Sequence, residues 1–223
     1  MKHSYLGFTL TAALAALTIA CGSPEGQVID NFLRATQAKD TQTVTSFSVV
    51  QFDQEIKSWK VVSVGEEQRT PAPLSALAAA HKAADEAVDQ NKKDAVAYFN
   101  AHPLEVDTVK PLVENGGAIP AKFQKTATDW KRFNDTDKEL KAKAAETQKA
   151  YDREKNLVIK SIVQARDADS LVGDVITKTA IVEIASGGAN KSYAIQLRKY
   201  DVAPAGKSAK ALSRWLIQSI TPQ

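Results

Sequence analysis

Hydrophobic and polar positions follow a helical period through most of this chain and a strand period in its last part. Near the start, apolar and small side chains recur at helical spacing: Val28, Ile29, Phe32, Leu33 and Thr36. Asp40 interrupts this pattern and can cap a second, short helix. The aromatic and β-branched run Ser58–Val64 that follows is typical of a strand. The first part of the chain is therefore predicted to be helix, short helix, strand.

The last part of the chain predicts three further strands, two of them joined by a glycine-rich hairpin signal at residues 186–190. These strands cover residues 175–185, 193–198 and 214–220. Apolar residues alternate with mostly polar ones in them, so that one face of the sheet is apolar. Together with the first strand they predict an antiparallel sheet of about four strands, enough for an independent core.

The middle of the chain, residues 71–169, is rich in alanine and charged residues and predicts two long helices. They cover residues 72–100 and 121–167. At about 1.5 Å per residue they would be about 43 Å and 70 Å long, so arms of equal length require residues 104–115 to continue the first helix beyond a kink at Pro103. We expect a long antiparallel, coiled-coil-like hairpin with a glycine turn, in preference to the alternative of a compact three-helix bundle.

The apolar positions of both long helices fall on the seam of a coiled coil. The apolar residues predicted in this seam are Leu77, Ala84, Val88, Leu140, Ala144 and Tyr151. His81 and Asn91 share the seam as polar positions, which restrict the register of the two helices at some cost in stability.

The first residues are typical of an export signal, because a short basic start precedes an apolar run, residues 6–20, that is too short to span a bilayer comfortably. Cys21, the chain's only cysteine, follows this run directly. Leu17-Thr18-Ile19-Ala20-Cys21 resembles the lipobox of bacterial lipoproteins, in which the cysteine thiol is acylated and cleavage makes that cysteine the new N-terminus. The alternative is an ordinary secretory signal with an incidental cysteine, which would have no disulfide partner in the chain.

The lipobox resemblance implies lipidation at Cys21, with acyl chains such as palmitate holding the protein on a membrane. It places the protein in the bacterial cell envelope. Gly22, in place of an aspartate after the cysteine, implies sorting to the outer membrane, facing the periplasm, if the cell is Gram-negative.

These observations predict an α+β fold in which one domain is interrupted by a helical segment. Its predicted parts are a signal peptide at residues 1–20, the first part of the domain at 21–70, an inserted helical hairpin at 71–169 and the second part of the domain at 170–223. The two outer parts need each other, because the first strand has no partner in its own part and the last three strands lack a helix to cover their apolar face.

A family resemblance rests on five segments of the two outer parts, Val28–Leu33, Trp59–Val64, Thr179–Ile184, Tyr193–Arg198 and Trp215–Ile217. Their order and pattern resemble the small NTF2-like (cystatin-like) domains of bacterial lipoproteins. The resemblance implies an N-terminal helix packed into the concave face of a curved antiparallel sheet, and a cone-shaped cavity between the two. The family has a turn where this chain has its long middle segment, and the fold would not by itself define a function.

Histidines and acidic residues show no spacing typical of a metal site. His81 and His102 are too far apart along a helix to share a metal ion. Asp135, Asp137 and Glu139 alternate in the sequence but diverge around a helix axis, so we expect a solvated face. No metal or cofactor is therefore predicted.

Other candidate chemistry is equally sparse. Ser75 and Ser161 lack the glycine context of a nucleophile elbow, and Gly187-Gly188 suits a hairpin better than a phosphate-binding loop. Trp130 with Phe133 could form an exposed partner site, but aromatic residues at helical spacing are more often core. The sequence predicts no catalytic residue.

The chain carries 29 basic and 26 acidic residues, a net charge of +3, with the two signs interspersed. This balance provides no electrostatic footprint for nucleic acid. The function expected first is a membrane-anchored, non-catalytic interaction or scaffold module that binds a protein partner through its helical hairpin. The alternative is a small-ligand binder that uses a cavity between the helix at 28–36 and the sheet; an enzyme is expected least.

Overall fold

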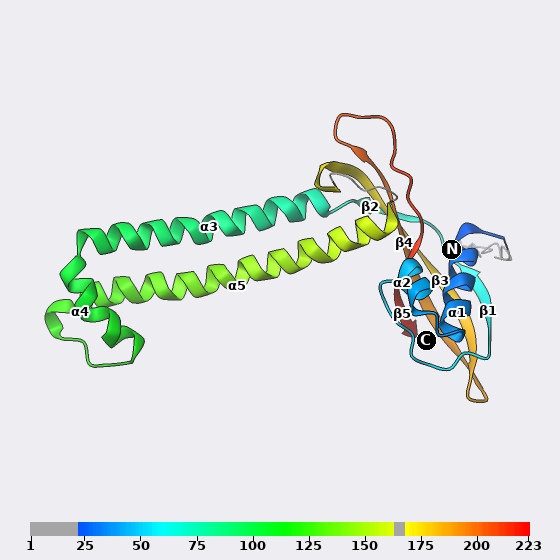
Figure 1. Ribbon diagram of the computed structural model, residues 1–223, viewed down its shortest axis with the longest axis horizontal. Coiled ribbons are helices and arrows are strands. Elements are labelled where there is room, and N and C mark those ends of the chain that lie inside the picture. The colour runs from blue at the N-terminus through cyan, green and yellow to red at the C-terminus, as the bar shows by residue number, and fades with distance from the viewer. Residues whose placement is uncertain (1–21, 163–167) are drawn as a thin grey trace, which may run out of the picture. The chain divides into compact units, whose positions relative to one another are not determined.

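The structure, a computed structural model, describes residues 22–162 and 168–223, and these form an α+β fold as predicted (Figure 1). The helices are α1 (Pro24–Gln37), α2 (Thr41–Phe47), α3 (Leu74–Ala101), α4 (Pro103–Glu114) and α5 (Gln124–Ser161). The strands are β1 (Ser58–Val64), β2 (Gln68–Pro71), β3 (Leu171–Ser186), β4 (Ala189–Pro204) and β5 (Leu216–Pro222). The predicted signal peptide at 1–20 and Cys21 lie outside the described residues.

Local signals explain where the first two helices begin. Ser23 caps α1, because its hydroxyl accepts a hydrogen bond from the Gly26 N–H at 3.1 Å. Asp40 caps α2 in the same way through the Thr43 N–H at 3.0 Å. The predicted order of helix, short helix and strand is confirmed.

The strands form one open antiparallel sheet in the order β1-β3-β4-β5, and β2 also pairs with β3. The register places Trp59 beside Ile184 and Ile195 beside Ile220. Between β3 and β4 lies the predicted glycine turn, where Gly187 and Gly188 both have positive φ angles, 56° and 94°, that glycine adopts without strain.

The sheet has five strands where about four were predicted, because β2 was not expected. All four residues of β2 are exposed, and its sequence, Gln-Arg-Thr-Pro, does not alternate between apolar and polar residues. It ends in Pro71, which lacks the backbone N–H that a central strand needs. The strand β2 forms because it pairs with β3, and no local sequence pattern predicts this long-range contact.

Packing divides the chain into two compact units. Of the described residues, the first unit comprises those up to Gln68, Thr177–Arg198 and Trp215–Gln223, and the second comprises those within Arg69–Ile176 and Lys199–Arg214. In the first unit, fully buried side chains of α1 and of the sheet form the core: Ile29, Phe32, Leu33, Val182, Ile184, Ile195, Leu197 and Leu216. The predicted boundaries at residues 70 and 170 stay predictions.

The core of the second unit joins the end of α5 to the strands. Its buried cluster includes Leu74, Leu157, Val158, Ile162, Leu171, Val175, Tyr200 and Val202. The Ser161 hydroxyl donates to the Arg214 carbonyl oxygen at 2.7 Å, and Ile162 forms an isolated antiparallel bridge with Ser213. These contacts coincide with the end of α5, so the helix predicted over 121–167 is shorter than expected.

The predicted continuation of the first arm through residues 104–115 is wrong. The helix α3 ends at Ala101, and the backbone of His102, with φ −134° and ψ 47°, leaves the helical conformation. Pro103, which lacks a backbone N–H to continue the hydrogen-bond ladder, then begins the separate helix α4. Leu112 and Val113 of α4 line the same depression as Ala127 of α5, so α4 folds back beside the first turns of α5.

Candidate functional site

The helices α3 and α5 of the second unit lie against one another in antiparallel directions (Figure 1). The Asn91 side-chain amide donates to the Phe133 carbonyl oxygen at 3.2 Å, and the rings of His81 and Tyr151 lie 6.1 Å apart. An earlier residue of α3 thus contacts a later residue of α5, as expected for two antiparallel helices. The two helices and α4 form the candidate interaction element, which we call the helical arm.

The predicted seam residues lie on the inner side of the helical arm. Ala84 and Val88 are buried, with 4 % and 8 % of their surface exposed. The remaining seam residues are half-buried: Leu77, His81, Asn91, Leu140, Ala144 and Tyr151. The two helices therefore pack against one another through a seam that is only partly buried.

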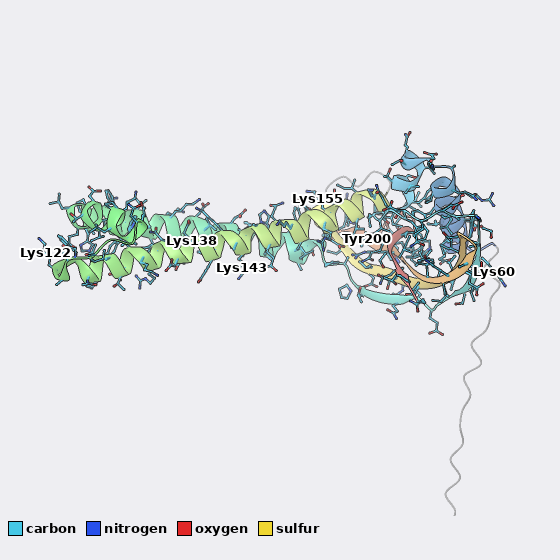
Figure 2. The ribbon with its side chains drawn as sticks, turned by 90° about the horizontal axis from the view of Figure 1, so that it is seen from below. Lys60, Lys122, Lys138, Lys143, Lys155 and Tyr200 are labelled. Atoms are coloured by element: carbon cyan, nitrogen blue, oxygen red, sulfur yellow. The ribbon has the colours of Figure 1, made fainter. Side chains whose placement is uncertain are left out.

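The outer side of α5 is solvated and charged. Lys131 pairs with Asp135 at 2.6 Å, and Lys141 pairs with Asp137 at 2.6 Å, each four residues apart on the helix. Lys138 and Lys143 also lie along this helix (Figure 2). Asp135 and Asp137 therefore each pair with a lysine of their own helix and not with a shared ligand, and exposed pairs of this kind contribute little stability. Glu139, also singled out in the sequence, is exposed on the same helix.

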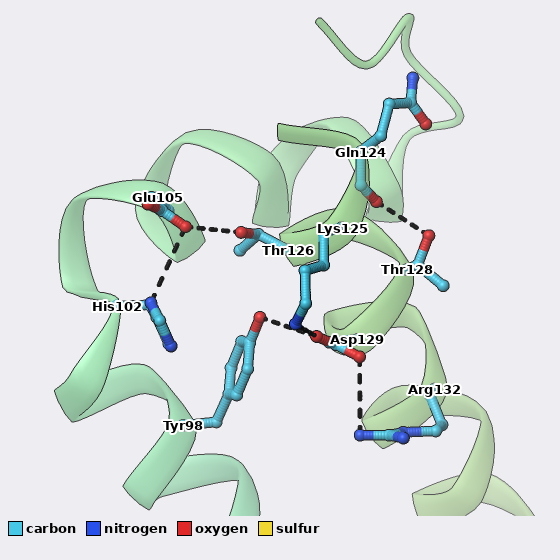
Figure 3. Close-up of polar contacts among 9 residues, drawn as sticks. All are labelled: Tyr98, His102, Glu105, Gln124, Lys125, Thr126, Thr128, Asp129 and Arg132. Atoms are coloured by element: carbon cyan, nitrogen blue, oxygen red, sulfur yellow. Dashed lines mark hydrogen bonds and ion pairs between the residues drawn. The ribbon is translucent and has the colours of Figure 1, made fainter. Parts of the chain in front are cut away.

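At the far end of the helical arm, α3 is tied to α5 by a polar network around Asp129 (Figure 3). The Tyr98 hydroxyl donates to Asp129 Oδ2 at 3.2 Å, and Lys125 Nζ lies 2.9 Å from the same oxygen. Arg132 Nη2 lies 3.6 Å from Asp129 Oδ1. The hydrogen bond from Lys125 lowers the pKa of Asp129, while burial, followed by the neighbouring carboxylate, raises the pKa of Tyr98.

A second set of contacts ties α4 to α5 (Figure 3). The Thr126 hydroxyl donates to Glu105 Oε2 at 2.6 Å, and His102 Nδ1 lies 3.8 Å from the same carboxylate oxygen. Val106 and Val109 of α4 are fully buried. The tip of the helical arm is therefore a packed structure rather than a simple turn.

The tip also presents apolar surface. Leu104 of α4 is 82 % exposed. An open depression of about 290 Å³ lies between α4 and α5, with the apolar side chains of Leu112, Val113 and Ile119 in its wall. Gly117 closes the α4 turn against Leu112, where an added Cβ would approach the leucine Cδ2 to 3.0 Å. The tip therefore carries an exposed leucine and, separately, a shallow depression with both apolar and polar residues in its wall.

Side chains of α1 are buried on the side of the first unit where the resemblance implied a ligand cavity. Ile29, Phe32 and Leu33 of α1 are fully buried. Polar contacts hold the helix at its two edges: Lys178 Nζ lies 2.7 Å from Glu25 Oε1, and the Trp59 indole N–H donates to Asp30 Oδ1 at 2.7 Å. The helix α1 thus contributes apolar side chains to the core of the first unit.

The histidines singled out in the sequence lie in separate places. His81 Nε2 is 3.4 Å from Asp85 on its own helix, whereas His102 lies beside Glu105 at the tip. In the part of the chain that the structure describes, no three histidine, cysteine, aspartate or glutamate side chains are grouped to hold a metal ion. Ser161 is fully buried and bonded to a carbonyl oxygen, so it is not available to a substrate.

Two polar contacts were not predicted from the sequence, Tyr98 with Asp129 and Glu25 with Lys178. Their partners lie 31 and 153 residues apart, and no local spacing relates them. The Lys125 and Asp129 pair could have been found, because residues four apart on a helix are neighbours.

No family model matches this chain, and neither a curated protein nor a solved structure is significantly similar to it. None of the helices within residues 22–162 and 168–223 is both long and apolar enough to cross a bilayer. The functional argument therefore rests on the residues and the geometry above.

Proposed function

We propose that this protein is a bacterial envelope lipoprotein, anchored through Cys21, that binds a protein partner through the helical arm without catalysis. In this proposal residues 21–70 and 170–223 form an NTF2-like domain, and residues 71–169, which include the helical arm, are an insertion into it. The membrane is one partner, through the lipid, and the second partner is a protein.

The observation that carries the proposal is the construction of the arm's tip. An isolated hairpin that served only as a spacer would need a short turn between its helices. Here a whole helix, α4, is bonded to α5 through Thr126 and Glu105, and it presents Leu104 to solvent. Protein interfaces concentrate most of their binding energy in a few residues, and Leu104 is the exposed apolar side chain that the tip offers for this role.

The ligand-binding alternative receives less support. It needs a cavity between α1 and the sheet, whereas Phe32 and Leu33 of α1 are fully buried. The anchor, in turn, is supported by the lipobox-like residues Leu17–Cys21.

Site-specific photo-crosslinking in intact cells tests the role of the tip. A photoreactive amino acid replaces Leu104 in one strain and Leu212 in another, because these leucines are similarly exposed, 82 % and 75 %. We expect a discrete crosslinked protein from position 104 that is absent from position 212. Equal crosslinking from both positions, or none from position 104, would contradict the proposal.

The anchor has its own test. The Cys21→Ser chain should leave the membrane fraction while keeping its fold, because Cys21 precedes the capped start of α1. A substituted chain that stays with the membrane would show that another feature holds it there.

A further inference from the structure

One residue of the first unit has a backbone conformation that side chains disfavour. Lys39, just after α1, has a φ angle of 57°, and no other residue except glycine has a positive φ in the part of the chain that the structure describes. The Lys39 N–H donates to the Thr36 carbonyl oxygen at 3.1 Å, and the Asp40 N–H donates to the Ala35 carbonyl oxygen at 2.9 Å. Glycine is the usual residue in this kind of turn at a helix end, because it adopts the conformation without strain. The turn alone therefore does not explain a lysine at this position.

The side chain of Lys39 lines an open pocket of about 190 Å³. The end of α1, the first turns of α2 and residues 51–53 form the wall of this pocket, all within the first unit. Pockets for drug-sized ligands measure about 300–1,000 Å³, so this pocket fits a smaller molecule.

The apolar part of the pocket wall is fixed by the packing of the protein itself. Val44 of α2 is 8 % exposed. The ring of Phe52 lies edge-on against Tyr193 of β4, with 5.1 Å between the ring centroids. The Tyr193 hydroxyl donates to Gln54 Oε1 at 2.7 Å, which holds the segment around Phe52 against the sheet.

The charged part of the wall carries one group of each sign. Within the described residues, neither the Lys39 ammonium nor the Asp53 carboxylate forms a hydrogen bond or an ion pair. The neighbouring carboxylate of Asp40 bonds the N–H and the hydroxyl of Thr43 and so is committed to capping α2. The wall thus presents an ammonium group and a carboxylate that are both available to a ligand.

We propose that this pocket binds a small zwitterion, a free α-amino acid with an aliphatic side chain. The ligand carboxylate bonds Lys39, its ammonium group bonds Asp53, and its side chain contacts Val44 and Phe52. A ligand with a single charge satisfies only one of the two groups. The phosphoethanolamine headgroup of a lipid has both charges but no aliphatic side chain for the apolar wall. The site depends neither on the lipid anchor nor on the helical arm, so it goes beyond the proposed function.

Isothermal titration calorimetry of the full chain with valine tests the site. We expect saturable binding with a Kd of about 1 mM, as befits a small ligand in an open pocket. N-Acetylvaline keeps only the carboxylate and valine methyl ester keeps only the ammonium group, so each should bind at least about tenfold more weakly. No saturable heat with valine, equal binding of either analogue, or tighter binding of phosphoethanolamine would overturn the proposal.

Variants of the two charged residues assign the binding to this pocket. Lys39→Gly and Asp53→Asn should each weaken valine binding at least about tenfold. Glu55→Gln is the matched control, because Glu55 is exposed, removes the same charge as Asp53→Asn and lies outside the pocket wall. Lys39→Gly should unfold at no lower temperature than the parent chain, since glycine suits the turn, so its loss of binding is not a loss of fold. A Lys39→Gly chain that binds valine as tightly as the parent would overturn the proposal.

Discussion

The hydroxyl of Tyr98 on α3 donates a hydrogen bond to Asp129 on α5, with 3.2 Å between the two oxygens. The Tyr98 ring also packs against His102 and Phe133, with ring centroids 4.8 Å and 5.5 Å away. One side chain thus links the end of α3 to the start of α4 and to α5. The tip of the helical arm depends on this link.

Replacing Tyr98 with phenylalanine should remove the hydrogen bond and keep the ring contacts. We expect the free energy of unfolding to fall by about 1 kcal/mol, since a typical hydrogen bond contributes that much. Chemical denaturation measures the change. Asp129→Asn in the same background should then cost less than it does in the parent chain, and full additivity of the two changes would show that the side chains do not interact.

Val158 and Ile159 form a matched pair of neighbours on α5. Val158 lies in the core of the second unit, with 2 % of its surface exposed, whereas Ile159 is 51 % exposed. Val158→Ala should destabilise the protein by about 2 kcal/mol, and Ile159→Ala by less than about 0.5 kcal/mol. Thermal and denaturant unfolding report both values, and similar losses for the two variants would mean that the packing described for this cluster is incorrect.

Lys178 stabilises the ionised form of the Glu25 carboxyl. Burial alone would raise the pKa of this carboxyl, but hydrogen bonding and attraction from Lys178 lower it overall. Lys178→Met should cost about 2 kcal/mol, because it leaves a buried carboxylate unpaired. Adding Glu25→Gln to that variant should restore part of the loss; a double variant less stable than Lys178→Met would refute this reasoning.

Acid should weaken the second unit through Asp201. Ion pairs with Lys210 at 2.6 Å and Arg69 at 2.8 Å lower the pKa of Asp201 from its usual 3.8. Because the folded pKa lies below the unfolded one, the stabilisation is complete above pH 3.8 and is lost as the pH falls through the folded value. The difference in unfolding free energy between the parent chain and Asp201→Asn should therefore be largest near neutral pH and shrink in acid. A difference that is constant with pH would exclude this ion-pair contribution.

The sequence predicted correctly those elements whose bounds depend on residues close together in the chain. The strand at Ser58–Val64 has the predicted bounds, and Asp40 caps a helix as expected. Both rest on the intrinsic preferences of the residues themselves.

The sequence does not predict boundaries that distant residues determine. No proline or glycine marks the end of α5, which lies where Ser161 bonds Arg214 and Ile162 pairs with Ser213. The candidate site shows the same division: the seam follows from heptad spacing, whereas the contact of Thr126 with Glu105 exists only once α4 has folded back on α5.

The account depends most on the anchor at Cys21, because the proposed location of the protein follows from it. Mass spectrometry of the mature N-terminus, on protein extracted from membranes, tests it directly. We predict that the mature chain begins at Cys21 and carries diacylglycerol on the thiol. A mature chain that begins at another residue, or an unmodified Cys21, would contradict the account.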